Sequence, residues 1–259
     1  MKILVSNDDG IFAPGIKALS ETLAKRHEVY VAAPDRERSA NSHALTLNKP
    51  LRAEEITIFK DVKASWHING TPADCVKIAL GSLLDFEPDL VISGINRGQN
   101  MGTDVIYSGT VSAAMEGNIL GIQSIAVSLA SFDDKHYQTA ADFILDFIEN
   151  FKTASLPPKT LLNVNVPSIP NEEVKGFKIT KLGIHKYMDV IERREDLRGK
   201  VYYWLGGSPV EHNDDHDTDT EAVKSKFISI TPIHYDLTNY DFMSQLSNWK
   251  LDSKIEVKK

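Results

Sequence analysis

The chain of 259 residues has only one cysteine, Cys75, so an intrachain disulfide is excluded. It also lacks any run near the roughly 20 apolar residues that cross a bilayer. The start MKILVSNDDG has one lysine and too short an apolar run for a secretory signal. We therefore expect a cytoplasmic protein that does not bind a membrane, with Cys75 as a small buried residue of a helix.

Positive charge is also scarce. Lysine and arginine number 29 against 36 aspartates and glutamates, which gives a formal net charge of −7. This is the wrong sign for a protein that binds the phosphate backbone of polymeric nucleic acid, so that class of partner is not expected. The 42% of hydrophobic residues and 25% of charged residues are typical of a globular protein with a sizeable core.

Apolar β-type runs alternate with helical patterns over the first 165 residues. The expected strands are KILVS, EVYVAAP, DLVISG, QSIAVSL and TLLNVNV. The expected helices are PGIKALSETLAKR, TPADCVKIALGSLLDF, TVSAAMEGNILG and HYQTAADFILDFIENF. This alternation predicts a doubly wound α/β layer with a mostly parallel sheet, in which ligands bind beyond the carboxyl ends of the strands.

The chain changes character after residue 165. The β-type stretches FKITKL, VYYWLGG and FISITPIHY alternate with charged loops, which predicts a catalytic core over residues 1–165 and a smaller β-rich portion with hairpins over 166–259. The segment EHNDDHDTDTEA holds His212, His216 and several acids. It has no fixed metal-ligand spacing, so a solvated acidic loop is the favoured interpretation.

Two adjacent aspartates follow the first strand. Asp8 and Asp9 repel one another, and Gly10 permits a turn that lets both side chains leave the strand together. They could bind a shared ligand; alternatively, one could cap the loop while the other is solvated.

Two further strand ends are rich in polar residues. The strand EVYVAAP runs into a loop with Ser39 and Asn41, and DLVISG runs into INRGQNMGTDVIYSGT, which carries Asn96. There SGT opens a helix, so backbone N–H groups, a capping hydroxyl and the positive helix end meet at one place. The sequence therefore predicts an anion site, most simply for a phosphate.

Together the strand ends supply oxygen ligands only. The candidate metal ligands are Asp8, Asp9, Ser39 and Asn96. Carboxylate, hydroxyl and amide oxygens suit Mg²⁺ or Mn²⁺ rather than Zn²⁺, and two carboxylates neutralise one divalent ion. We expect one such ion per subunit and phosphoryl chemistry beside it.

Several stretches of the chain resemble one family, the stationary-phase survival protein SurE, a group of metal-dependent nucleotidases. The matching stretches are SNDDGIFAPGI, APDRERSANS with the following LTL, NGTPADCV, SGINRGQNMGTDVIYSGTVSAAMEG, NVNVP and ITPIHYDLT. They run in order from the N-terminus to about residue 238, so the resemblance covers nearly the whole chain.

The resemblance implies a Rossmann-like, three-layer fold and removal of phosphate from nucleoside 5′-monophosphates, and possibly 3′-monophosphates. It also implies a homodimer or homotetramer that exchanges C-terminal elements. It places the metal on the four ligands above, and the phosphate on Ser39, Asn41, Asn96, Ser108, Gly109 and Thr110. Asp104 and His234 are implied as candidates for proton transfer or loop closure, beside Asp8 and Asp9 as catalytic groups.

The expected reaction is in-line attack of water on the phosphate, with release of the nucleoside hydroxyl. The sequence leaves open whether Asp8 or Asp9 acts as general base or as nucleophile. A nucleotide sensor that binds without hydrolysis is the alternative function. A phospho-receiver domain is disfavoured by its length and by the SGIN to SGT loop, and a haloacid-dehalogenase-like phosphatase by the missing DxDx[TV] spacing.

Overall fold

The computed structural model describes residues 1–133, 135–151, 156–184, 186–210 and 216–249. The strands of its large sheet are β1 (Lys2–Ser6), β2 (Glu28–Pro34), β3 (Ala53–Glu55), β4 (Ala64–Ile68), β5 (Leu90–Arg97), β6 (Ser124–Ala130), β7 (Thr160–Pro167), β8 (Phe177–Ile179) and β11 (Ile228–His234). A separate hairpin consists of β9 (Lys186–Glu195) and β10 (Val201–Val210). The helices are α1 (Pro14–Leu23), α2 (Pro72–Ile78), α3 (Gly109–Ile119), α4 (Tyr137–Phe151), α5 (Asp219–Lys224) and α6 (Tyr240–Leu246), with shorter turns η1 (Ala79–Leu83), η2 (Gly102–Tyr107) and η3 (Asn171–Glu173).

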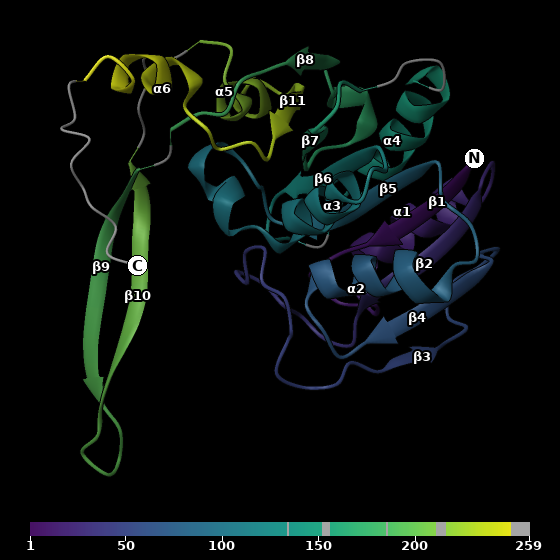
Figure 1. The fold of residues 1–259 in the computed structure, drawn as a ribbon, viewed down its shortest axis with the longest axis horizontal. Coiled ribbons are helices and arrows are strands. Elements are labelled where there is room, and N and C mark those ends of the chain that lie inside the picture. Colours follow the sequence, from purple (N-terminus) through teal and green to yellow (C-terminus); the bar gives the residue numbers. More distant parts are fainter. Residues whose placement is uncertain (134, 152–155, 185, 211–215, 250–259) are drawn as a thin grey trace, which may run out of the picture.

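The large sheet has the order β3-β4-β2-β1-β5-β6-β7-β11-β8 in the described part of the chain (Figure 1). The six strands from β4 to β7 in this order run parallel. Strand β3 pairs antiparallel with β4 and β11 pairs antiparallel with β7, whereas β11 and β8 run parallel to each other. Strand order reverses between β1 and β5, because the chain first winds outward on one side of β1 and then on the other. A doubly wound sheet opens a crevice at such a point, beyond the carboxyl ends of the strands.

Helices cover both faces of this sheet. On β1, Ile3 and Val5 belong to the core under α1 and α4, whereas Leu4 belongs to the core under α2 and α3. This alternation follows from the two-residue period of a strand. The three-layer, Rossmann-like α/β fold predicted from the sequence is thus confirmed, with the five predicted strands and four predicted helices at the expected places.

Local sequence accounts for where the helices begin. Pro14 occupies the first turn of α1, where a missing N–H costs nothing. Thr71 and Asp74 form a capping box at α2, with the Thr71 hydroxyl accepting from the Asp74 backbone and the Asp74 carboxylate accepting from the Thr71 backbone. Ser108 caps α3 by accepting a hydrogen bond from the backbone N–H of Val111.

Some elements differ from the sequence prediction. The helix expected over residues 71–86 ends as a helix at Ile78 and continues as one π-helical turn, η1. Strands β3 and β4 lie in a stretch where the sequence predicts no regular element, and β9 lies where it predicts a charged loop. Strand β3 has only three residues and β9 is rich in charged residues, so the hydrophobic patterns of these two are weak.

The part of the chain after residue 165 contributes two strands to the large sheet and also forms a separate hairpin. Strands β8 and β11 extend the large sheet, whereas the β9–β10 hairpin stands away from the main body (Figure 1). The division into residues 1–165 and 166–259 stays a prediction. Within the described residues, no helix is both long enough and apolar enough to cross a bilayer.

The acidic segment 211–222 is not simply a solvated loop. Residues 211–215, including His212, lie outside the described residues, but the segment ends in α5. There Asp219 is fully buried and accepts hydrogen bonds from the backbone N–H groups of Gly102 at 2.7 Å and Gly183 at 3.0 Å. Its carboxylate therefore ties the start of η2 to the C-terminal part of the chain.

Candidate functional site

The loop after β1 is a tight turn that holds both aspartates beyond the strand. The side chain of Asn7 donates to the Gly10 carbonyl at 2.9 Å and accepts from the Gly10 N–H at 3.2 Å. Gly10 has a φ of +97°, and a Cβ there would lie 2.9 Å from the carbonyl carbon of Arg36. Only glycine fits this conformation and this space, so Gly10 makes the turn that the sequence predicted after Asp8 and Asp9.

The carboxylate of Asp8 lies against the N-terminus of α3. The Thr110 hydroxyl donates to Asp8 Oδ1 at 2.5 Å. A Cβ at Gly109 would lie 2.8 Å from Asp8 Oδ2, so only a glycine lets the helix start come this close. The structure therefore brings Asp8 together with two residues of the predicted phosphate site.

Burial makes the Asp8 carboxyl a weaker acid than an ordinary aspartate. Loss of solvent raises its pKa to about 7, the hydrogen bond from Thr110 opposes this rise, and the negative charge of Asp9 adds to it. Because the buried Asp8 carboxyl is costly to ionise beside the negative charge of Asp9, the site favours a bound cation, which would stabilise Asp8 in its charged form.

The end of β5 meets the same loop. The backbone N–H of Arg97 donates to Asp9 Oδ2 at 2.9 Å. The neighbouring Asn96 is buried, and its Nδ2 donates to the Gly98 carbonyl at 2.8 Å. Since the amide nitrogen is used within its own loop, Oδ1 is the end of Asn96 that can bind a cation.

The loop after β2 reaches the site from the other side of β1. The backbone N–H of Arg38 donates to the carbonyl of Asp8 at 2.7 Å. Ser39 follows directly and is exposed, with its hydroxyl donating to Glu37 Oε1 at 2.8 Å. Asn41 is also exposed and donates to the Arg38 carbonyl at 3.0 Å. Ser39 and Asn41 therefore stand on a loop that is joined to Asp8 through its backbone.

The donor set fits a hard divalent cation. No group of three or more His, Cys, Asp and Glu side chains converges as a metal site among the described residues. The candidate site instead combines two carboxylates with neutral oxygens. That composition suits Mg²⁺ or Mn²⁺. A bound cation would also stabilise the charged form of Asp8, which burial disfavours, as its raised pKa indicates.

The two candidates for proton transfer stand at different places relative to this group. Asp104 is half-buried in η2, on the segment whose last residues lead into the start of α3. His234 is exposed at the end of β11 and pairs with Thr160, the first residue of β7. Because β11 runs antiparallel to β7, His234 lies at the amino ends of the parallel strands, whereas Asp8 lies beyond their carboxyl ends. Within one chain the structure therefore does not bring His234 to Asp8, and the candidate site does not include it.

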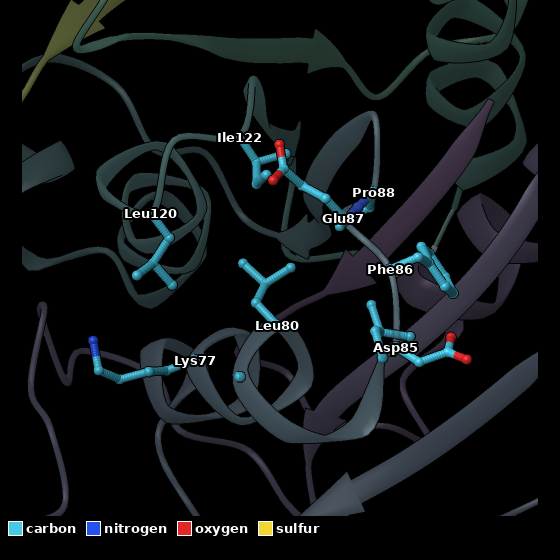
Figure 2. A pocket seen from close by; sticks show the side chains of 10 residues that line it. Lys77, Leu80, Asp85, Phe86, Glu87, Pro88, Leu120 and Ile122 are labelled. Carbon is cyan, nitrogen blue, oxygen red and sulfur yellow. The ribbon is translucent and has the colours of Figure 1, made fainter.

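A cavity lies elsewhere on the molecule. Its volume is about 590 Å³, and its lining includes Leu80, Leu84, Leu120 and Ile122. Figure 2 shows Lys77 and the acidic residues Asp85 and Glu87 around the apolar side chains. The lining of the cavity includes the residues just before β5 and β6, so it opens at the amino ends of the parallel strands. It is therefore distinct from the oxygen-rich site at the opposite edge of the sheet.

Sequence reasoning missed the groups that hold the site together. Asn7 closes the turn around the two aspartates, and the backbone N–H groups of Arg38 and Arg97 bind Asp8 and Asp9. An asparagine three residues before a glycine is a turn signal that could have identified Asn7. The backbone donors carry no side-chain signal and could not have been found this way.

The fold and the site define a class: a doubly wound α/β protein with an oxygen-rich site, suited to a cation and a phosphate, at the switch point of its sheet. The family model described as "Survival protein SurE" matches residues 3–189. The chain is 51% identical over 253 residues to the 5′-nucleotidase SurE of Carboxydothermus hydrogenoformans and 52% identical over 256 residues to that of Thermosynechococcus vestitus, with 96% of each chain covered in both cases.

A solved structure agrees with these relatives. The SurE protein from Aquifex aeolicus superposes with a TM-score of 0.83 at 41% sequence identity, over 95% of this chain and 98% of that one. The chain belongs to the SurE family.

Proposed function

We propose that this protein is a metal-dependent 5′-nucleotidase that removes the phosphate from nucleoside 5′-monophosphates. The observation that supports it most directly is the contact between the Asp8 carboxylate and the first turn of α3, at Gly109 and Thr110. A cation-binding carboxylate beside a helix N-terminus can hold the metal and the phosphate of one substrate together. The printed name of the relatives, 5′-nucleotidase SurE, supports the same activity.

The proposed roles follow from the chemistry of each side chain. One Mg²⁺ or Mn²⁺ would be held by Asp8, Asp9, Ser39 and Asn96. When bound, the ion would neutralise charge on the phosphate and polarise it for attack. Asn41 and the start of α3 from Ser108 to Thr110 would bind phosphate oxygens through amide, hydroxyl and backbone N–H donors. Asp104 stays a candidate for proton transfer.

The proposed reaction exchanges one P–O bond for another. The oxygen of a water molecule forms the new bond to phosphorus, and the bond to the nucleoside oxygen breaks, so that the nucleoside leaves as an alcohol after gaining a proton. Asp8 or Asp9 could take the proton from water or attack phosphorus itself. Rapid acid quench distinguishes the two, since only the second route leaves an acid-trappable aspartyl phosphate.

The test is phosphate release from AMP in the presence of Mn²⁺ or Mg²⁺. We expect Asp8→Asn to lower turnover by roughly 10³-fold or more, because it removes charge from the metal and the phosphate at once. Asp146→Asn, on the exposed side of α4, is a matched control and should leave turnover unchanged. Near-normal activity of Asp8→Asn would refute the metal assignment.

The same assay separates the alternative function. A nucleotide sensor would bind nucleoside monophosphates and release no phosphate from any of them. A panel of 5′- and 3′-monophosphates also shows which position and which base the enzyme prefers.

We also propose that the protein acts as a homodimer or homotetramer with exchanged C-terminal elements. Large apolar side chains are exposed on the β9–β10 hairpin, including Trp204 at 60% and Leu205 at 84%, and in the tail, including Leu237 at 94%. Side chains of this kind are rarely left in water when they are grouped. A solution mass equal to one subunit, measured by light scattering, would contradict the proposal. The cytoplasmic location stays a prediction from the sequence.

A further inference from the structure

The loop that carries Ser39 and Asn41 is long and has no regular structure of its own. Residues 35–52 contain neither helix nor strand. A connection of this length loses much conformational entropy when it is ordered, and loops this long are uncommon in compact domains unless they carry function. Something outside the loop must therefore hold Ser39 and Asn41 in place.

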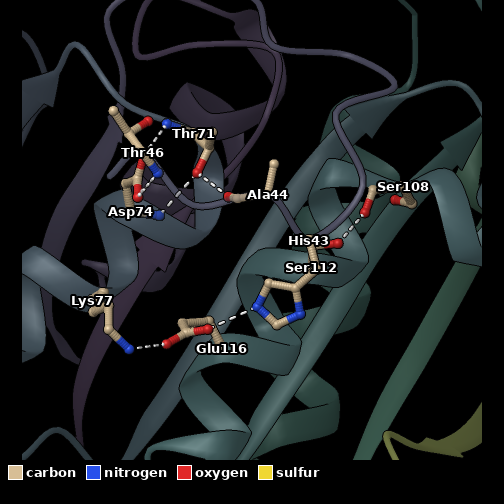
Figure 3. A network of polar contacts seen from close by, with 9 residues as sticks. All are labelled: His43, Ala44, Thr46, Thr71, Asp74, Lys77, Ser108, Ser112 and Glu116. Carbon is tan, nitrogen blue, oxygen red and sulfur yellow. Dashed lines mark hydrogen bonds and ion pairs between the residues drawn. The ribbon is translucent and has the colours of Figure 1, made fainter. Parts of the chain in front are cut away.

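The strongest outside contact is a buried carboxylate on α3. His43 Nε2 lies 2.7 Å from one oxygen of Glu116, and Lys77 Nζ lies 2.7 Å from the other (Figure 3). The Glu116 side chain is only 4% exposed. The hydrogen bond from His43, followed by that from Lys77, lowers the pKa of Glu116, so its charge is retained although solvent is largely excluded.

Two more contacts hold the following residues of the loop to the start of α2. Asp74 accepts from the backbone N–H of Thr46 at 3.0 Å, and the Thr71 hydroxyl donates to the carbonyl of Ala44 at 2.7 Å (Figure 3). Asp74 is itself buried and completes the capping box of α2 with Thr71. The same groups that begin this helix therefore also bind the loop.

The loop is held on its other side by η2. The Ser42 hydroxyl donates to the carbonyl of Ile106 at 2.8 Å, and the Ser42 N–H donates to that of Tyr107 at 3.2 Å. The residues that follow, from Ser108, begin α3. Contacts at residues 42, 43, 44 and 46 thus fix the loop immediately after Asn41.

We propose that His43, Glu116 and Asp74 are positioning residues of the nucleotidase, which fix the loop bearing Ser39 and Asn41 against α3. Glu116 stands on the same helix whose first turn holds Gly109 and Thr110. The hydrogen bond between His43 and Glu116 therefore connects the loop with the metal and phosphate ligands to the helix with the phosphate-binding turn. The inference rests on the proposed function, because it needs those ligands to act in catalysis.

The two partners of Glu116 allow a sharp experiment. His43→Ala removes the contact between the loop and α3 but leaves Glu116 paired with Lys77, so no buried charge is left alone. Lys77→Ala removes the other partner and leaves the loop attached, which makes it the matched control. His43→Gln keeps an amide donor at about the place of Nε2 and tests for rescue.

The assays are kcat and KM for AMP with Mn²⁺, and hydrogen–deuterium exchange of residues 39–47 in the whole protein. We expect His43→Ala to lower kcat/KM by about tenfold or more, since displacement of a catalytic ligand by a fraction of an ångström has effects of this size. Exchange in residues 39–47 should rise in that variant. Lys77→Ala and His43→Gln should each stay within about threefold of the parent protein, in the range of substitutions that preserve the geometry.

Two results would overturn the inference. One is equal kcat/KM for His43→Ala and Lys77→Ala; the other is a loss in His43→Ala that only follows the fraction of unfolded protein. If the parent protein releases no phosphate at all, the proposed function fails instead. Hydrogen exchange then still decides whether His43 holds the loop, since unchanged exchange in His43→Ala would refute the attachment.

Discussion

Gly109 offers the sharpest test of the geometry around Asp8. The Cβ of an alanine at this position would lie 2.8 Å from both Cβ and Oδ2 of Asp8, whereas ordinary contacts begin at 3.4 Å. The Asp8 side chain, or the first turn of α3, would have to move by about 0.6 Å, the difference between these two distances. The backbone of Gly109 is not in the left-handed region, so the alanine adds no backbone strain.

We expect Gly109→Ala to lower the stability of the protein modestly and its activity strongly. Overpacking costs about 1 to 3 kcal/mol, and the better helix propensity of alanine offsets up to about 1 kcal/mol of it. We expect the free energy of unfolding to fall by about 1 to 2 kcal/mol. A misplacement of 1 Å near the reacting atoms can cost about a hundredfold. We therefore expect kcat/KM to fall by about tenfold to a hundredfold in Gly109→Ala.

Phosphate release and a urea unfolding curve on the same preparation measure the two quantities. Gly81→Ala is the control, because a Cβ at Gly81 would meet nothing within 4 Å. Activity equal to that of the parent protein in Gly109→Ala would show that Asp8 is not held against α3 as described. If Gly109→Ala is strongly destabilised and its activity falls only in proportion to the fraction of unfolded protein, displacement of Asp8 is not the cause of the lost activity.

Two further predictions concern the Asp8 carboxyl. Its pKa is raised from 3.8 to about 7, so the stability that the protonated form provides to the metal-free protein is fully present below about pH 4 and is lost as the pH rises to about 7. Because a proton and a metal ion compete for this carboxyl, Mn²⁺ should raise the melting temperature more at pH 8 than at pH 5.5; an equal increase would contradict the metal assignment. Thr110→Val removes the hydroxyl that opposes this pKa rise. It should lower kcat/KM by about tenfold, typical of one lost hydrogen bond to a charged group, and unchanged kinetics would show that this bond has no part in catalysis.

The local pattern of the chain was enough to predict most of the fold. Alternation of apolar strands and amphipathic helices is a short-range signal, and the strands β1, β2, β5, β6 and β7 were predicted from it. The carboxyl ends of parallel strands necessarily meet at one edge of the sheet. For that reason Asp8, Asp9 and Asn96, which follow or end such strands, could be expected together before their contacts were known.

The place of His234 could not be predicted in the same way. Its strand, β11, is recognisable as a strand, but its direction depends on pairing with β7 and β8, which are distant in the sequence. The antiparallel pairing moves His234 to the far edge of the sheet. Similarly, nothing in the local sequence distinguishes Glu116 from an ordinary helix residue. Its role depends on tertiary packing, which places His43 and Lys77 beside it.

Neighbours along the chain set the α/β class, the chemical nature of the candidate ligands and the strand ends at which these ligands stand, so all three could be predicted from the sequence. Three features come from the packing of distant segments: Asp8 is buried against α3, its pKa is raised to about 7, and Glu116 contacts the neighbouring loop through His43. Burial and hydrogen bonding between distant segments depend on how the layers pack, and no local pattern encodes them.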